Sequence, residues 1–148
     1  TGIINVEPKN FLKSNNGCCY DRSRIIEKAL TFYTFKVRKI FLIDISKGYI
    51  SLILPKVNSH SVIEVKTSKG WMGIETVQPY FLLINDSNKP LSFKMAINTN
   101  YNFPKKEFYY KKPLSIIGLY SRHGGFHKPY FPLPEVNFKD FFSMNFNR

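Results

Sequence analysis

A glycine followed by two cysteines opens the one segment of this chain that has clear helical periodicity. After the run Gly17-Cys18-Cys19-Tyr20-Asp21-Arg22-Ser23, apolar residues recur on one helical face, namely Ile25, Ile26, Ala29, Leu30 and Tyr33. Asp21 stands in the first turn, where a negative side chain interacts favourably with the helix dipole. The pattern therefore predicts an amphipathic helix from Cys18 to Tyr33 with a thiol in its first turn.

The residues that follow this helix predict an antiparallel sheet. Residues 35–45 are mostly β-formers, and a second apolar run at 49–54 stops at a proline. Residues 60–67 alternate in polarity, and the turn Ser68-Lys69-Gly70 leads into a further strand at 71–77. We therefore expect an α+β fold in which the helix packs on one face of an antiparallel sheet.

The second half of the chain gives weaker signals. Residues 80–84 fit a strand or a short helix, 85–90 a loop, and 91–97 a helix. Five prolines stand among aromatic residues toward the end of the chain, which favours extended segments over the last forty or so residues: Pro104, Pro113, Pro129, Pro132 and Pro134.

Length and composition fit one domain. The chain has 148 residues, of which 43% are hydrophobic, so it can bury one core, and no repeat or linker divides it. We expect a single domain over residues 1–148, with its core at about 17–77 and a C-terminal extension, 78–148, that wraps the core. No run approaches 18 apolar residues, so the sequence predicts no membrane span.

The net charge of +12 suggests nucleic acid or another anionic partner. However, the basic residues are scattered, and the densest clusters are the pairs Lys105-Lys106 and Lys111-Lys112. A generally basic surface is therefore the preferred interpretation. The chain opens on Thr1 rather than on a methionine, so a removed leader is compatible with it and the compartment stays open. Free thiols are compatible with the cytoplasm.

Cys19 is the candidate nucleophile. A cysteine reacts as its thiolate, and the unpaired backbone N–H groups at a helix start lower the pKa of a thiol from about 8.5. The same groups can stabilise the oxyanion of a tetrahedral intermediate. The alternative is that Cys18 and Cys19 are small buried hydrophobic residues at a helix start.

His60 and Glu75 are the candidate partners of this thiol. His60 opens the alternating strand and can aim its ring at the helix start, although a lone histidine is more often a surface or core residue. Counting outward from Lys69 places Glu75 opposite Ile63, a few positions from His60. A carboxylate there would hold the imidazole tautomer and stabilise the imidazolium.

The sequence implies no cofactor and no metal site. Adjacent cysteines rarely form a disulfide with each other, and two are too few for structural zinc. His123 and His127 flank two glycines, which argues against the helix that metal binding at this spacing needs, and no third ligand stands out. We expect Trp71 in the core.

Three elements together resemble the transglutaminase-like superfamily. The run from Gly17 to Asp21 resembles its Gly-x-Cys-x-Asp element, and His60-Ser61-Val62-Ile63-Glu64-Val65 its His-x-x-x-Glu-Val strand. Gly70-Trp71-Met72-Gly73-Ile74-Glu75 is similar to its Gly-Trp-x-x-x-Asp strand. The resemblance covers about residues 17–77. It implies a papain-like core, with Cys19 as nucleophile, His60 as general base and acid, and Glu75 as the orienting acid.

The chain departs from this family in two ways. Glu75 stands where the family usually has aspartate, and a second oxyanion donor is not evident. Asn10, Asn15 and Asn16 are candidates for that donor, and it can also precede Thr1.

The resemblance implies acyl transfer from an amide through a thioester. A peptidase or amidase is the leading interpretation, acting on a protein, peptide or other amide-containing substrate, because a cross-linking enzyme also needs a site for the amine. A catalytically inactive module that binds peptide or glycan is the first alternative. It rests on Glu75 and on an aromatic C-terminal stretch comprising Phe126, Tyr130, Phe131, Phe138, Phe141, Phe142 and Phe146. A basic nucleic-acid-binding domain is the second alternative.

Overall fold

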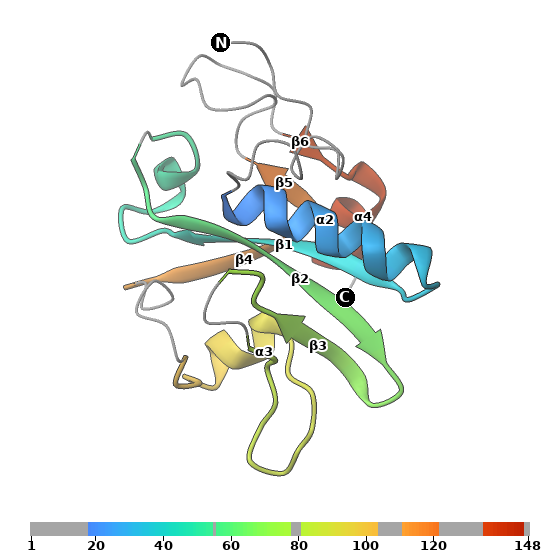
Figure 1. The fold of residues 1–148 in the computed structure, drawn as a ribbon. Coiled ribbons are helices and arrows are strands. Elements are labelled where there is room, and N and C mark those ends of the chain that lie inside the picture. The colour runs from blue at the N-terminus through green and yellow to red at the C-terminus, as the bar shows by residue number, and fades with distance from the viewer. Residues whose placement is uncertain (1–17, 55, 78–80, 104–110, 122–134, 147–148) are drawn as a thin grey trace.

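The described part of the chain is an α+β fold built on a curled antiparallel sheet (Figure 1). The computed structural model describes residues 18–54, 56–77, 81–103, 111–121 and 135–146. The sheet has the strand order β3-β2-β1-β4, and these strands are β1 (Val37–Asp44), β2 (Ser59–Thr67), β3 (Gly70–Ile74) and β4 (Pro113–Ile117). The predicted packing of a helix on an antiparallel sheet is confirmed, with helix α2 (Cys19–Phe32) on β1 and β2.

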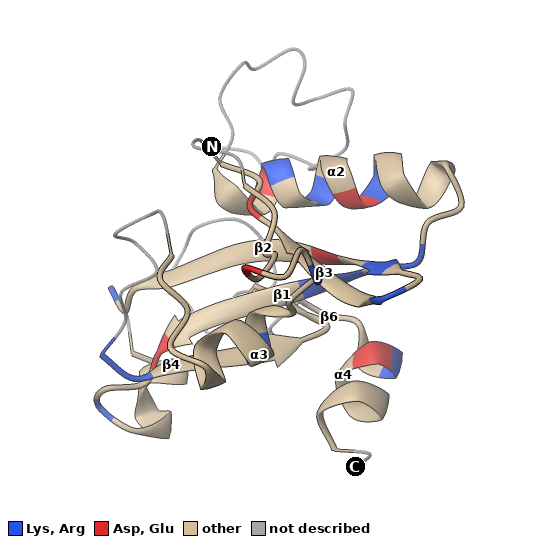
Figure 2. Cartoon of the chain, turned by 90° about the horizontal axis from the view of Figure 1, so that it is seen from below, with Lys and Arg blue, Asp and Glu red and all other residues tan. Residues whose placement is uncertain are grey.

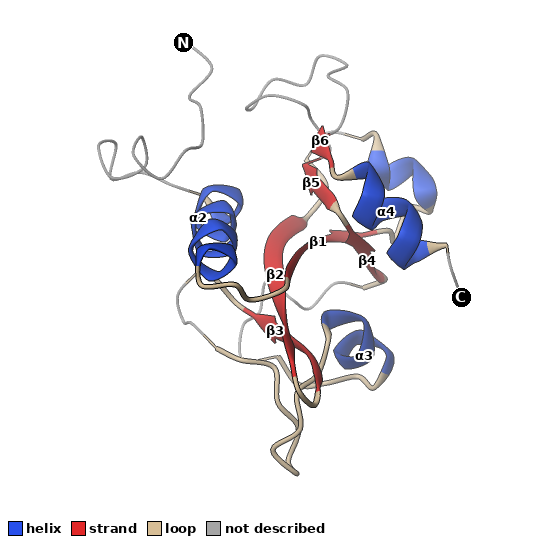
Figure 3. Ribbon diagram, turned by 90° about the vertical axis from the view of Figure 1, so that its right-hand side faces the viewer, coloured by secondary structure: helices blue, strands red, loops and turns tan. Residues whose placement is uncertain are grey.

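Strand β1 is central and is covered on both faces, which explains its run of buried apolar residues from Ile40 to Ile43. Figure 3 shows α2 on one side of the sheet, with helices α3 (Phe93–Asn98) and α4 (Phe138–Asn145) on the other. The main core lies on the α3 side and includes Ile40, Leu42, Val62, Leu83, Leu91, Phe93, Ala96, Phe103 and Ile117. A smaller apolar cluster consists of Phe41, Ile43, Ile45 and Leu119.

The first turn of α2 is held by a local cap. The carboxylate of Asp21 accepts a hydrogen bond from the backbone N–H of Cys18, with 2.8 Å between Oδ2 and N. This bond satisfies one of the backbone donors that a helix start leaves unpaired. The helix therefore begins where the sequence predicts, at the two cysteines.

Strands β2 and β3 form the expected hairpin, but its register differs by one residue from the predicted one. Thr67 pairs with Gly70, so the loop consists of Ser68 and Lys69 alone, and Ile63 pairs with Ile74. The predicted count placed the centre of the turn on Lys69, whereas it lies between the two loop residues. Glu75 consequently follows the last β3 residue, one position beyond the partner of Ile63.

Two further predictions about secondary structure were wrong. The run at 49–54 is not a strand: it contains a 3₁₀ helix, η1 (Tyr49–Leu52), whose Tyr49 and Ile50 are exposed and whose Ser51 N–H bonds to Gly48. Short apolar runs do not distinguish strand from helix. The expectation of extended chain near the C-terminus fails at α4, although β4, β5 (Leu119–Ser121) and β6 (Glu135–Val136) are extended.

Three other predictions agree in part with the structure. Helix α3 forms within the stretch where a helix was expected. Leu82 and Ile84 make isolated bridges. Trp71, which was expected in the core, lies on β3 and is only half-buried. The Cζ atom of Arg38 lies 4.0 Å from the centroid of the Trp71 ring.

Basic residues do not gather on one face of the described structure. Figure 2 shows Lys and Arg on α2, around the β2–β3 hairpin and on loops, with acidic residues between them on α2. None of the helices in the described ranges has the length and apolar character that crossing a membrane requires.

Candidate active site

The thiol of Cys19 lies at the start of α2, where the sequence places it. Cys18 is exposed and occupies the N-cap position, and Cys19 is half-buried as the first helical residue. Backbone N–H groups in this turn point out of the helix, so Cys19 lies at its electropositive end.

His60 and Glu75 form a close pair. The Nε2 atom of His60 lies 2.9 Å from Oε2 of Glu75 and 3.1 Å from Oε1, and the Glu75 side chain is fully buried. The backbone N–H of Val77 donates to Oε1 at 2.7 Å and fixes the carboxylate. A carboxylate only accepts hydrogen bonds, so Nε2 carries a proton and Nδ1 is the nitrogen that can take one. The glutamate therefore reaches the histidine.

The first turn of α2 fills a gap at the edge of β2. Along an antiparallel strand, the N–H and C=O of successive residues point to alternate sides. Lys66 bonds toward β1, so odd-numbered residues of β2 point toward β3. β3 ends at Ile74 opposite Ile63, so Ser61 has no β3 residue opposite it. The C=O of Ser61 instead accepts a hydrogen bond from Ser23 of α2, at 2.6 Å.

The same edge stabilises the Cys19 thiolate. A hydrogen bond from the Cys18 thiol is the largest influence that lowers the pKa of Cys19, which falls from 9.0 to about 6. Backbone N–H groups of Ser61 and Tyr20 lower this pKa further, while burial and the negative charge of Glu75 oppose them. The hydrogen bond to Cys19 raises the pKa of Cys18. Near neutral pH, Cys19 is therefore the thiolate and Cys18 is the donor.

This assignment predicts opposite results for two substitutions of Cys18. Cys18→Ala removes the donor and is expected to raise the pKa of Cys19 above about 6, whereas Cys18→Ser keeps a hydroxyl donor and preserves more of the shift. Both variants leave Cys19 as the one thiol of the chain, so the pH dependence of iodoacetamide alkylation reports on it directly. Identical profiles for the alanine and serine variants would contradict the role of Cys18 as donor.

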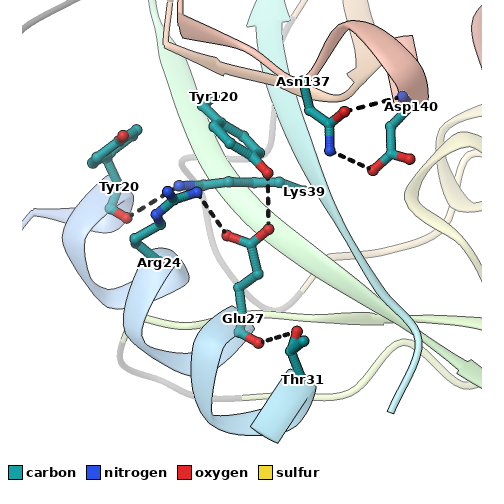
Figure 4. A network of polar contacts seen from close by, with 8 residues as sticks. All are labelled: Tyr20, Arg24, Glu27, Thr31, Lys39, Tyr120, Asn137 and Asp140. Carbon is teal, nitrogen blue, oxygen red and sulfur yellow. Dashed lines mark hydrogen bonds and ion pairs between the residues drawn. The ribbon is translucent and has the colours of Figure 1, made fainter. Parts of the chain in front are cut away.

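A buried lysine supports the first turn of α2 from the sheet (Figure 4). Lys39 of β1 is fully buried, and its Nζ lies 3.7 Å from the centroid of the Tyr20 ring and 3.4 Å from the Tyr20 carbonyl oxygen. Two turns further along α2, Glu27 accepts a hydrogen bond from the Tyr120 hydroxyl at 3.0 Å. The Lys39 contacts fix α2 against β1 at Tyr20, the residue after Cys19, and the Glu27 contact fixes the helix against β5.

The structure thus brings the segments of all three predicted site residues together. His60 pairs with Glu75, and Cys19 contacts the backbone of Ser61, the residue after His60. Sequence reasoning did not identify Ser23 or Thr76, which are fully buried between these segments. No motif marks either residue, because their importance depends on the strand edge that α2 covers.

Several candidates fall outside the described residues, namely Asn10, Asn15, Asn16, His123 and His127. Within the described ranges, no group of three or more His, Cys, Asp or Glu side chains is arranged to hold a metal ion. Comparison of the chain with protein-family models, curated protein sequences and solved structures finds no match.

Proposed function

We propose that this protein is a cysteine acyl-transfer enzyme that hydrolyses amide bonds, with Cys19 as nucleophile, His60 as general base and acid, and Glu75 as the orienting acid. The pairing of His60 with the buried Glu75 carboxylate carries this proposal. His60 directly precedes Ser61, whose backbone N–H contacts the Cys19 sulfur. A histidine paired to a buried acid beside a thiol of lowered pKa is the arrangement that activates a cysteine.

The reaction follows from these roles. His60 takes the proton of the Cys19 thiol, so the site holds a thiolate and an imidazolium. The thiolate attacks the amide carbonyl carbon, and backbone N–H groups at the start of α2 stabilise the oxyanion. The C–N bond then breaks, and the His60 imidazolium gives its proton to the departing amine, leaving a thioester. Water attacks the thioester while His60 takes its proton, and expulsion of the thiolate releases the acid. The negative charge of Glu75 stabilises the imidazolium throughout.

The alternatives receive less support from the described residues. Doubt about the reach of Glu75 was one reason to expect an inactive binding module, and its carboxylate does contact His60. Over the part of the chain that the structure describes, the dispersed basic residues do not form the stripe that a nucleic-acid-binding domain would use (Figure 2). A protein cross-linker would use the same three residues with an amine in place of water.

The deciding experiment is the pH dependence of iodoacetamide alkylation at Cys19, read by peptide mass spectrometry. In the wild type, the alkylation rate is expected to rise with pH around the Cys19 pKa of about 6. His60→Ala is expected to move this rise to higher pH, because the variant lacks the imidazole that takes the Cys19 proton in the proposed mechanism. The protein unfolded in urea supplies the profile of an ordinary thiol, and circular dichroism confirms that the variant is folded.

Two outcomes would count against an enzyme. One is a thiol in the folded wild type that titrates like the urea-unfolded control. The other is a Cys19 profile that His60→Ala leaves unchanged. Either result would move the binding-module hypothesis to first place.

A further inference from the structure

Ser23 links the three chain segments that carry the proposed catalytic residues. It lies on α2 one turn after Cys19, and its side chain is fully buried. Its hydroxyl donates to the C=O of Ser61 at 2.6 Å, next to His60. Its oxygen also lies 2.9 Å from the hydroxyl oxygen of Thr76, the residue after Glu75.

The two hydrogen bonds of the Ser23 hydroxyl have defined directions. A serine hydroxyl has one proton and two lone pairs. Because the Ser23 proton goes to the Ser61 carbonyl, the proton between the two hydroxyls must come from Thr76. The Ser23 hydroxyl therefore donates to the backbone of β2 and, at the same time, accepts from the segment after β3. Among small side chains, a hydroxyl suits both roles because it carries one proton and two lone pairs.

We propose that Ser23 is a positioning residue, a clasp that holds the cysteine helix in register with the His60 strand and the Glu75 segment. This inference rests on the proposed function. Cys19 and Ser23 are four residues apart on one helix face, and both interact with backbone groups of Ser61. The clasp thereby fixes the Cys19 sulfur against the Ser61 N–H, while the bond to Thr76 ties the same point to Glu75.

The test compares Ser23→Ala with Ser92→Ala. Both replace a buried serine that makes a hydrogen bond, but Ser92 caps α3, where its oxygen accepts from the N–H of Met95 at 3.2 Å. Ser23→Ala is expected to raise the apparent pKa of Cys19 by about one pH unit, which lowers alkylation at pH 6.5 roughly threefold. Ser92→Ala is expected to lower the melting temperature while leaving the Cys19 profile unchanged. If the wild-type thiol has a lowered pKa, a Ser23→Ala profile that matches the wild type, or an equal change in Ser92→Ala, would overturn the proposal.

A second pair of variants works even if Ser23→Ala fails to fold. Thr76→Val keeps the shape of the side chain and removes its hydroxyl, whereas Thr76→Ser keeps the hydroxyl. Thr76→Val is expected to move the pH profile of Cys19 alkylation in the same direction as Ser23→Ala. Thr76→Ser is expected to keep the wild-type profile. If the wild-type thiol has a lowered pKa, equal profiles for the two Thr76 variants would overturn the proposal.

Amide hydrogen exchange separates failure of the clasp from failure of the proposed function. Loss of the clasp is expected to speed exchange by at least severalfold at the hydrogen-bonded amides of α2 that begin with Arg22, whose N–H bonds to the Cys18 carbonyl, whether or not Cys19 is a nucleophile. Fast exchange in Ser23→Ala with a wild-type thiol of ordinary pKa would uphold the clasp and reject the enzyme. A thiol of low, His60-dependent pKa with unchanged exchange in Ser23→Ala would uphold the enzyme and reject the clasp.

Discussion

Glu64→Ala is expected to lower the free energy of unfolding by about 3–5 kcal/mol, because it leaves the largely covered Arg38 guanidinium without its partner. Glu64 is almost fully buried on β2, where its Oε2 lies 2.6 Å from one terminal nitrogen of Arg38 and accepts from Nε at 2.7 Å. Its other oxygen accepts from the backbone N–H of Phe93 at 2.6 Å, at the start of α3. One side chain therefore joins β1, β2 and α3.

Urea unfolding followed by tryptophan fluorescence measures this loss. The chain has one tryptophan, Trp71, and its ring lies under the Arg38 guanidinium. Glu64→Gln, which keeps an acceptor for Phe93 but loses the charge, is expected to retain part of the stability. Glu27→Ala is the matched control, since Glu27 also accepts two side-chain hydrogen bonds but outside the core. A loss in Glu64→Ala no larger than in Glu27→Ala would contradict this account.

The position of Glu64 shows where sequence patterns stop being informative. Residues 60–67 alternate in polarity, but this pattern does not indicate that α3 and Arg38 cover the face that carries Glu64. The partners of Glu64 lie 26 and 29 residues away along the chain. A pattern of local polarity cannot show which distant element will cover a strand.

Local signals did predict what depends on neighbouring residues. The start of α2 follows from the Asp21 cap, and the β2–β3 hairpin follows from its turn residues. The hairpin in turn places Glu75 near His60, because antiparallel pairing fixes distances between strands that are close in sequence. The observed register differs by one residue from the predicted one and places Glu75 at the level of Val62 instead of Ile63. This position is nearer to His60, so the predicted proximity of the two residues does not depend on the error.

Long-range pairing is the part that the sequence did not reveal. β4 lies some seventy residues after β1 and pairs beside it, for example through Ile40 and Ile117. Nothing local distinguishes this strand from the other apolar runs near the C-terminus. The roles of Ser23 and Thr76 depend on the same kind of information, because both face a strand edge that exists only once β3 has ended.

Glu75→Gln is expected to lower Cys19-dependent turnover on the order of 10²- to 10⁴-fold with little change in stability. The amide is the same shape as the carboxylate and can still accept from the N–H of Val77. Its NH₂ group, however, would face Nε2 of His60, which must then accept rather than donate. The ring proton would move to Nδ1, and His60 could no longer take a proton from the reaction.

The measurement is release of p-nitrophenol from p-nitrophenyl acetate, with the rate of Cys19→Ala subtracted as background. Glu75→Asp separates charge from reach: it keeps the negative charge on a shorter side chain, so it is expected to lose less activity than the amide. Glu27→Gln makes the same exchange on α2 at an acid that contacts Tyr120 instead of His60, and it is expected to keep the wild-type rate. If Glu75→Gln retained more than half of the wild-type rate, the histidine tautomer would not matter to the reaction, and Glu75 would be a structural acid. A large loss confined to Glu75→Gln would instead show that the glutamate orients His60 in the role that aspartate usually has in transglutaminase-like enzymes.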